Sequence, residues 1–230
     1  MDEAERLMFQ AWASMPPCRS KVAQAQSIIK EALEISPAYV ACSWGKDSLV
    51  LAHLVWSIAP DTLLFHDGSD DEDEQDNYSE VREAFLGRFP MPYQGITRGY
   101  NDGDGGGLYE QLPLHPMVFL GLRAEESKPR RISLKKYGLL HQYQSDSAVR
   151  PLNHWRCCPL AWWNWKDVWA YIVAHDLPYL SAYDWEPRDR GRTSVIHGKR
   201  INPKHSALAM GQSERLRRRN PEFWEKLTHA

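Results

Sequence analysis

The pattern of apolar and polar residues along the chain predicts strands that alternate with helices. Residues 39–42 form a short apolar run and 49–58 an apolar stretch of helical length, which together predict a strand, a tight loop and a helix. The same reasoning predicts further strands at 62–66, near 92–97 and at 117–122, and helices at about 2–14, 20–35 and 76–88. Strands that alternate with helices predict a parallel sheet covered on both faces, with ligands bound beyond the carboxyl ends of the strands.

The loop between the first strand and its helix has the composition of an anion-binding site. It reads Ser43-Trp44-Gly45-Lys46-Asp47-Ser48. The N-terminus of the following helix presents unpaired backbone N–H groups and the positive end of the helix dipole, which together favour phosphate. The sequence does not match a Walker A loop, because Asp47 stands between the lysine and the serine and the first glycine is missing.

Three segments in the same order resemble motifs of the phosphoadenylyl-sulfate (PAPS) reductase family, within the N-type ATP pyrophosphatase (PP-loop) superfamily. The loop 43–48 is similar to the pyrophosphate-binding loop, with Trp44 where the usual form has glycine. The segment 121–131 resembles a Gly-x-Arg-x-x-Glu-Ser…Arg motif, and 159–184 a Pro-Leu…Asp-Val-Trp-x-Tyr-Ile…Leu-Pro-Tyr…Tyr-Asp stretch. The resemblance implies a Rossmann-like (HUP-type) α/β fold with a twisted, parallel five-stranded sheet, helices on both faces and a small helical C-terminal extension.

The resemblance also implies roles for individual residues. We expect catalysis from Lys46, Asp47 and Arg123, with Mg²⁺ held by Asp47. The expected nucleotide-binding residues are Ser43, Trp44, Gly45, Lys46, Asp47, Ser48, His66, Asp67, Gly121 and Arg123. The residues expected to hold a substrate oxyanion are Glu126, Ser127, Arg130, Arg131, Arg190 and Arg192, because the guanidinium fork suits phosphate and sulfate.

These expectations favour an enzyme that binds ATP with Mg²⁺ and cleaves it between the α and β phosphates. Positioning and electrostatic stabilisation of the departing pyrophosphate suffice for such a reaction. The acceptor would be an oxyanion or another substrate from sulfur metabolism or nucleic-acid modification. Two alternatives stay open: a PAPS reductase that acts on a sulfonucleotide, and a non-catalytic nucleotide- or nucleic-acid-binding module, suggested by Trp44 in the loop.

The four cysteines disfavour the reductase alternative. In that branch the resemblance places a catalytic cysteine in a short C-terminal motif, and residues 208–230 contain none. Cys157 and Cys158 supply the adjacent pair of the iron–sulfur reductases but no later Cys-x-x-Cys follows, so we expect no iron–sulfur cluster. No spacing typical of zinc ligands occurs, so we expect no zinc either. The pair just before Pro159 is expected to be buried at a strand end.

Charge is unevenly divided between the two halves of the 230-residue chain. Residues 1–115 carry 8 Lys and Arg against 19 Asp and Glu (net −11), whereas residues 116–230 carry 20 against 11 (net +9). A basic half suits a polyanionic substrate, and nucleic acid or a second protein subunit are possible partners through it, including through Arg215 and Arg217–Arg219. No membrane-spanning run occurs and the N-terminus is acidic, so we expect a cytoplasmic protein.

Three parts are expected along the chain. Residues 1–36 form N-terminal helices, 37–185 the nucleotide-binding α/β domain and 186–230 a basic extension. Within the domain, Asn164 and Asp167 have the spacing of a capping box at the start of a helix. Trp163, Trp169 and Tyr171 are expected to pack in the core.

Overall fold

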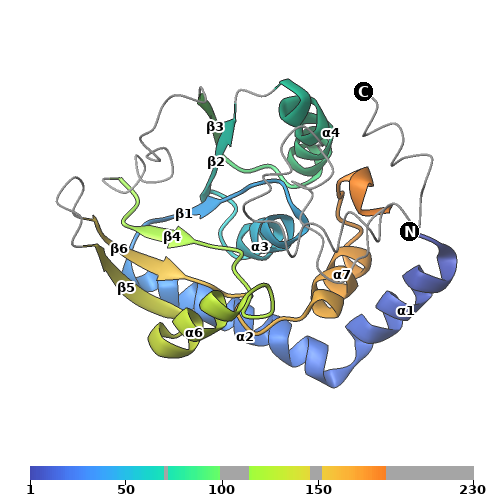
Figure 1. The fold of residues 1–230 in the computed structure, drawn as a ribbon, viewed down its shortest axis with the longest axis horizontal. Helices are drawn as coiled ribbons and strands as arrows, with labels where there is room; N and C mark the ends of the chain where they lie inside the picture. Colours follow the sequence, from blue (N-terminus) through green and yellow to red (C-terminus); the bar gives the residue numbers. More distant parts are fainter. Residues whose placement is uncertain (70–71, 99–113, 146–151, 185–230) are drawn as a thin grey trace.

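The computed structural model describes residues 1–69, 72–98, 114–145 and 152–184 (Figure 1). The elements in chain order are α1 (Glu3–Ser14), α2 (Pro16–Ile35), β1 (Ala38–Ala41), α3 (Lys46–Trp56), β2 (Leu63–Ser69), α4 (Glu72–Arg88), β3 (Tyr93–Arg98), β4 (Met117–Phe119), α6 (Lys128–Tyr137), β5 (Leu140–Ser145), β6 (Leu152–Cys157), α7 (Trp165–Ala174) and η1 (Ser181–Asp184). The chain therefore alternates strands and helices after two N-terminal helices, as its pattern predicts.

The described strands form one mixed sheet of six, in the order β3-β2-β1-β4-β6-β5. All neighbouring pairs are parallel except β5 and β6, which run antiparallel from Leu140 opposite Cys157 to Ser145 opposite Leu152. The α/β fold class is confirmed, but the sheet has one strand more than the five expected. The addition is β5, which follows α6 after Gly138 ends that helix with a φ of 82°.

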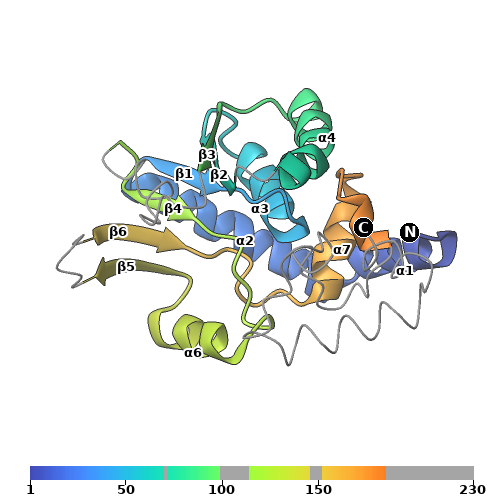
Figure 2. The ribbon, with the colours of Figure 1, turned by 45° about the horizontal axis from the view of Figure 1, so that its top comes forward.

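The main core lies on one face of the sheet, where helices α2, α3, α4 and α7 pack. Alternate strand residues such as Val40 and Leu64 point into this core, as the two-residue period of a strand requires. The opposite face carries a smaller cluster around Tyr39, Phe65 and Val118. Helix α6 packs on that face through Leu134, which contacts Cys158, and Figure 2 shows α6 across the β5–β6 pair from α2.

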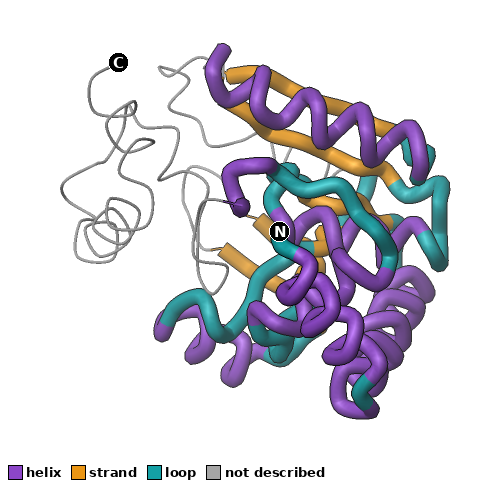
Figure 3. The backbone as a smooth tube through the Cα atoms, turned by 90° about the vertical axis from the view of Figure 1, so that its right-hand side faces the viewer, coloured by secondary structure: helices purple, strands orange, loops and turns teal. Residues whose placement is uncertain are grey.

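The N-terminal helices pack against the α/β domain. Helix α2 contributes Ala25, Ile29 and Ala32 to the main core. Helix α1 packs on α7, where the ring of Phe9 lies 6.2 Å from that of Trp165 and 6.3 Å from that of Trp169. Figure 3 faces the N-terminus and shows the helices clustered on this side of the molecule.

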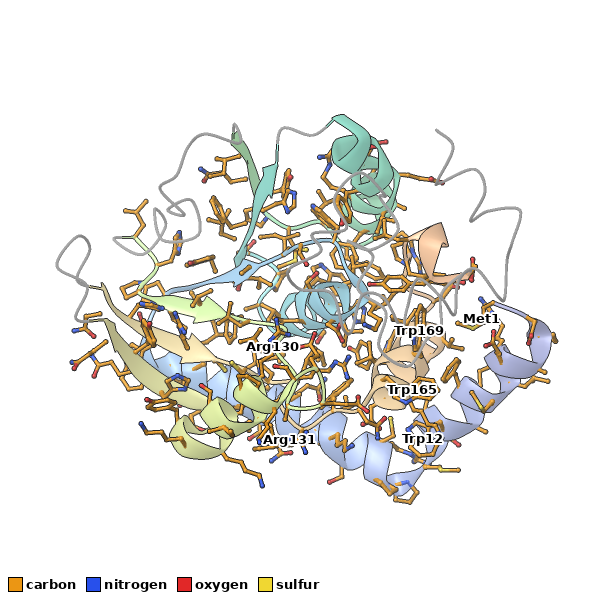
Figure 4. All side chains as sticks on the ribbon, in the orientation of Figure 1. Met1, Trp12, Arg130, Arg131, Trp165 and Trp169 are labelled. Atoms are coloured by element: carbon orange, nitrogen blue, oxygen red, sulfur yellow. The ribbon has the colours of Figure 1, made fainter. Side chains whose placement is uncertain are left out.

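The capping box at the start of α7 is confirmed. Asp167 N donates to the Asn164 side chain at 3.0 Å, and Asn164 N donates to Asp167 Oδ2 at 2.7 Å. Asp167 also accepts hydrogen bonds from Trp12 Nε1 at 3.0 Å and Lys21 Nζ at 2.5 Å, so the cap ties α1 and α2 to α7. Figure 4 labels Trp12 beside Trp165.

The expected aromatic core residues Trp163, Trp169 and Tyr171 are all buried, which confirms their packing role. Among the described helices, none combines the length and the apolar character that crossing a bilayer requires.

Candidate functional site

The loop after β1 opens onto the N-terminus of α3 at the carboxyl edge of the sheet. Gly45 is the N-cap residue of α3 and supplies no capping side chain. The loop is closed instead by Ser48, whose Oγ accepts from Ser43 N at 3.3 Å and donates to Gly45 O at 2.9 Å. The first N–H groups of a helix have no partners within it, so an uncapped start presents free donors and a positive dipole end to an anion.

Trp44 occupies the one position of this loop that needs a left-handed backbone. Its φ is 56°, an uncommon value for a bulky residue. The side chain is fully buried among the rings of His66, Phe85 and Tyr93, with centroids 5.7–6.3 Å away. The indole therefore lies in the core instead of narrowing the space over the loop. Its Nε1 has no hydrogen-bond partner among the described residues.

Asp47 links the two buried cations of the site. Its Oδ2 accepts from Lys46 Nζ at 2.9 Å and its Oδ1 from Arg123 Nε at 2.6 Å. Burial alone would raise the pKa of this carboxyl, but the charges of Lys46 and Arg123 outweigh it and hold the pKa below the ordinary value. Lys46 and Arg123 are themselves almost fully buried, at 3% and 2% exposure.

The segment after β4 continues this ion-pair network. Arg123 Nη1 donates to Glu125 Oε2 at 2.8 Å, and the same oxygen accepts from Trp165 N at 2.7 Å. Arg123 N donates to Glu126 Oε2 at 3.0 Å, and the Arg130 side chain also pairs with Glu126. Burial by itself would lower the pKa of the Arg123 guanidinium. The charges of Asp47 and the neighbouring carboxylates outweigh this effect and raise the pKa above its ordinary value, so Arg123 stays charged.

The cations of this network are already matched by carboxylates. Lys46, Arg123 and Arg130 face Asp47, Glu125 and Glu126. Arg123 therefore holds Asp47, and through it Lys46, beside the loop. Among the described residues, the donors that remain for an anion are the N–H groups of the first turn of α3 other than that of Lys46, which donates to the Tyr183 hydroxyl, and the remaining N–H groups of Lys46 Nζ.

The sequence did not single out two residues of this site, Tyr183 and Glu125. The ring of Tyr183 lies 5.4 Å from Lys46 Nζ, and its hydroxyl accepts from Lys46 N at 3.4 Å. Tyr183 belongs to the Tyr-Asp pair that ends the third motif, and this place in the motif could have indicated that it lies in the site. For Glu125, the sequence offered only its position between Arg123 and Glu126 in the second motif as an indication of a role in the site.

Four of the remaining expected residues, Gly121, His66, Asp67 and Ser127, lie in the described part of the chain near the ends of the strands or at the start of α6. Gly121 lies against the loop, where an added Cβ would lie 3.2 Å from the Asp47 carbonyl carbon, so this close backbone approach favours glycine. His66 Nδ1 lies 2.7 Å from Cys42 O at the end of β1, and Asp67 follows it in β2. Ser127 caps α6, accepting from Arg130 N at 3.3 Å.

The other expected residues lie away from the loop or outside the described residues. Arg131 is exposed on α6, and Figure 4 shows it on the side of that helix opposite Arg130. Arg190, Arg192 and the basic extension 186–230 lie outside the described residues, so those expectations stay predictions.

All four cysteines are buried thiols. Burial raises the pKa of Cys42 to about 11 and that of Cys158 to about 12, and it raises those of Cys18 and Cys157 as well. Cys157 ends β6 as expected. A thiol with a raised pKa is a poor nucleophile at neutral pH, because the thiolate is the reactive form.

The magnesium expectation for Asp47 stays a prediction. Each of its oxygens accepts one hydrogen bond from a cation, so a metal ion there would use the remaining lone pairs and lie close to two positive charges. Among the described residues no three His, Cys, Asp or Glu side chains gather in a way that would hold a metal ion.

Known proteins that resemble this chain belong to the group that its motifs indicate. The family model described as phosphoadenosine phosphosulfate reductase domain matches residues 108–189. The adenosine 5′-phosphosulfate reductase of Geobacillus thermodenitrificans is 28% identical over 165 residues, and that of Bacillus cytotoxicus is 30% identical over 168. Each of these matches covers 63% of this chain and 66% of the relative, just under two thirds of the relative's length.

Solved structures share the fold at low identity. Yeast FAD synthetase, in complex with FAD, superposes with a TM-score of 0.51 at 12% identity and covers 79% of this chain and 69% of that one. The tRNA thiolase NcsA from Methanococcus maripaludis, with its [4Fe-4S] cluster, gives a TM-score of 0.50 at 13% identity over 92% of this chain and 78% of that one. Together with the motifs, these matches show that the chain is similar to the phosphoadenosine phosphosulfate reductase domain family and to adenosine 5′-phosphosulfate reductases.

Proposed function

We propose that the protein is an enzyme that binds a sulfonucleotide, adenosine 5′-phosphosulfate or its 3′-phosphorylated form, at the N-terminus of α3. The observation that carries this proposal is the start of α3, where the N-cap residue Gly45 supplies no capping side chain, beside a buried lysine. Such a start takes a phosphate or sulfate group, and Lys46 adds a positive charge that Asp47 and Arg123 hold in place. The similarity to adenosine 5′-phosphosulfate reductases supports a sulfonucleotide as the anion.

The expected reaction on this substrate is reduction to sulfite and the corresponding adenine nucleotide. It requires a thiolate that attacks the sulfur, and each cysteine of this chain is buried with a raised pKa. A reductase reaction therefore needs either a rearrangement that exposes one of these thiols or a thiol supplied by a second molecule. The assay should accordingly include a dithiol reductant and thioredoxin.

The buried cysteines favour a second candidate, cleavage of ATP between the α and β phosphates. This reaction needs no protein nucleophile, since Lys46 and the N-terminus of α3 can stabilise the charge on departing pyrophosphate. Mg²⁺ would be shared with the phosphates, as in other nucleotide reactions. The first motif of the sequence supports this candidate and the relatives support the sulfonucleotide.

One experiment separates the two candidates. The protein is titrated calorimetrically with adenosine 5′-phosphosulfate, PAPS and ATP, and then incubated with each while sulfite, AMP and pyrophosphate are measured. Tighter binding of a sulfonucleotide with release of sulfite supports the first candidate, and AMP with pyrophosphate from ATP supports the second. Binding without any product favours the non-catalytic module, and no binding of any of the three contradicts the proposal.

The matched variants are Lys46→Ala and Lys30→Ala. Lys46 lies in the site, whereas Lys30 is an exposed lysine of α2. Lys46→Ala should weaken nucleotide binding at least about tenfold, in line with the loss of a hydrogen bond to a charged group. Lys30→Ala should leave binding unchanged, and equal affinities of the two variants would contradict the role of Lys46.

A further inference from the structure

Helix α6 and the two strands that follow it carry an unusual concentration of positive charge. Residues 128–145 and 152–158 contain no Asp or Glu at all, but six Lys or Arg: Lys128, Arg130, Arg131, Lys135, Lys136 and Arg156. Four of them, Lys128, Arg131, Lys135 and Lys136, are exposed, and we name these the α6 basic face. Within the described part of the chain, Arg130 is the one α6 cation in an ion pair, with Glu126.

The position of these charges on the helix argues against a merely solvated surface. Lys135 and Lys136 lie in the last turn of α6, where cations interact favourably with the helix dipole. Lys128 and Arg131 lie at the start of the helix, whose first turn contains no acidic residue. Cations there oppose the dipole and disfavour the helix. An external anion along this face would offset that repulsion.

A strip of planar side chains continues from the end of α6 across the sheet. Tyr137 is half exposed and stacks on His141, with ring centroids 5.4 Å apart and an angle of 25° between the planes. His141 is the cross-strand partner of Arg156, whose guanidinium lies 3.5 Å from the centre of the Tyr143 ring. We name Tyr137, His141, Tyr143 and Arg156 the planar strip. Its members share one face of the β5–β6 pair with α6.

We propose that the α6 basic face and the planar strip form a binding surface for single-stranded nucleic acid. The basic face provides charges for successive phosphates, and this part of the interaction requires no particular sequence. The planar strip provides stacking partners for bases, which a single strand exposes and a duplex hides. An acidic protein would match the charges, but it would leave the half-exposed Tyr137 and its stacked neighbours without a planar partner.

This surface is distinct from the candidate nucleotide site. The two are joined by the first residues of α6, since Ser127 caps the helix immediately after the Arg123 segment. The proposal does not rest on the proposed nucleotide substrate, because neither Lys46 nor Asp47 belongs to the surface. Lys46→Ala should therefore leave oligonucleotide affinity unchanged, so failure of either proposal is visible separately.

The test is fluorescence anisotropy with labelled mixed-sequence RNA and DNA single strands of about 15 nucleotides, a size within the range bound by known single-strand folds. A DNA duplex of the same sequence and a polyglutamate competitor are measured alongside. At about 50 mM salt we expect binding of a single strand with affinity at least about fivefold above the duplex, and a steep loss of affinity toward about 200 mM salt. Preference for RNA or DNA identifies the kind of strand.

Three variants distinguish phosphate contacts from stacking. Lys135→Glu should weaken binding about fivefold or more and reduce the salt dependence, because a phosphate contact is lost. Tyr137→Ala should weaken binding by a similar factor without altering the salt dependence, and Tyr137→Phe should restore it, since stacking needs the ring alone. The matched control is Lys30→Glu, the same charge reversal on α2, across the sheet from α6, and it should change affinity less than about twofold.

Several results would overturn the proposal. These are absence of binding at low salt, equal affinity for duplex and single strand, complete competition by polyglutamate, or equal effects of Lys135→Glu and Lys30→Glu. An unchanged affinity in Tyr137→Ala would reduce the surface to a general polyanion site. Because Lys135 and Tyr137 are exposed, their substitution leaves the core intact, and circular dichroism verifies folding of each variant.

Discussion

Asp47 accepts a hydrogen bond from Arg123 Nε at 2.6 Å, which joins two residues 76 positions apart in the chain. One belongs to the loop after β1 and the other to the segment after β4, and these two strands are neighbours in the sheet. Because parallel neighbours end at the same edge, the fold delivers both side chains to one place. The bond fixes the orientation of the Asp47 carboxylate, whose other oxygen holds Lys46.

Asp47→Ala should destabilise the protein by about 3 kcal/mol or more, because it leaves Lys46 and one side of Arg123 as buried charges without their partner. Urea unfolding followed by circular dichroism measures the change. The matched control is Asp176→Asn, since Asp176 also pairs with two arginines, Arg6 and Arg88, but at the exposed surface, and asparagine tolerates its φ of 49°. Loss of these surface pairs should cost less than about 1 kcal/mol, and equal losses in the two variants would contradict the role of Asp47.

The stability of the protein should fall between pH 7.5 and pH 5 because of His53. Burial, with His175 and Arg88 nearby, lowers the pKa of His53 to about 4. Between this pKa and the ordinary value near 6.5 the unfolded state binds the proton and the folded state does not, so stability decreases as pH falls through this window. The contribution is about 2 kcal/mol at pH 5 relative to pH 7.5.

His53→Gln tests this assignment through the slope of stability against pH. His53 Nδ1 lies 2.9 Å from the Tyr171 hydroxyl, so the variant is expected to be less stable at every pH. Its unfolding free energy should nevertheless change less between pH 7.5 and 5 than that of the unmodified protein. His154, whose pKa is also lowered to about 4, keeps part of the slope. An unchanged slope would show that His53 titrates normally.

Much of the fold follows from local patterns that the sequence displays. The strand and the helix around residues 39–58 are recognisable because the apolar stretch 49–58 has the length of a helix and a mostly polar loop separates it from the apolar run 39–42. The capping box of Asn164 and Asp167 is likewise local, since its partners lie three residues apart. Strand β5 was missed because His141, Gln142 and Gln144 give it the composition of a surface loop. Its pairing with β6 depends on a contact that no local pattern records.

The sequence singles out candidate site residues, but it does not show how their side chains are connected. The loop 43–48 and Arg123 were singled out, and Arg123 was expected to take part in catalysis and nucleotide binding, which stays a prediction. In the structure it pairs with Asp47 and Glu125, because both carboxylates lie within reach once β1 and β4 are neighbours. The position of Trp44 could not be inferred either, since its direction depends on a φ of 56° and on rings from three other elements.

Trp44→Gly should destabilise the protein by about 3 kcal/mol. Glycine adopts the positive φ without strain, which is a small gain, but removal of the buried indole leaves a large cavity among His66, Phe85 and Tyr93. Because the indole anchors the loop, nucleotide binding should weaken as well. Thermal unfolding and calorimetric titration measure the two effects. Unfolding at the temperature of the unmodified protein would show that the indole does not stabilise the fold.

Trp44→Phe provides the matched comparison. A phenyl ring keeps part of the packing with Phe85 but retains the backbone strain, so stability should lie between those of the unmodified protein and Trp44→Gly. If nucleotide affinity follows stability in this order, the indole acts by holding the loop. If Trp44→Gly binds nucleotide as tightly as the unmodified protein, the loop keeps its shape without the anchor.

The reactivity of the four thiols determines how the chain could act as a reductase. Cys18, Cys42, Cys157 and Cys158 are buried, and burial raises the pKa of each. In the native protein all four should therefore react with a thiol reagent such as Ellman's reagent far more slowly than in guanidinium, because few thiolates are present and access is blocked. The rate at which the coloured thiolate product of the reagent appears, measured with and without adenosine 5′-phosphosulfate, checks the prediction.

A fast-reacting thiol that appears only with the sulfonucleotide would show that ligand binding exposes a cysteine, and it would favour reduction by this chain's own thiol. Single Cys→Ser variants would then identify it, since only one of them should abolish the fast phase and sulfite release together. If every thiol stays slow while a product still forms, the chemistry does not use a cysteine of this chain. In that case substitution of all four should leave turnover intact, apart from the stability lost at Cys42 and Cys157, which contribute to the core.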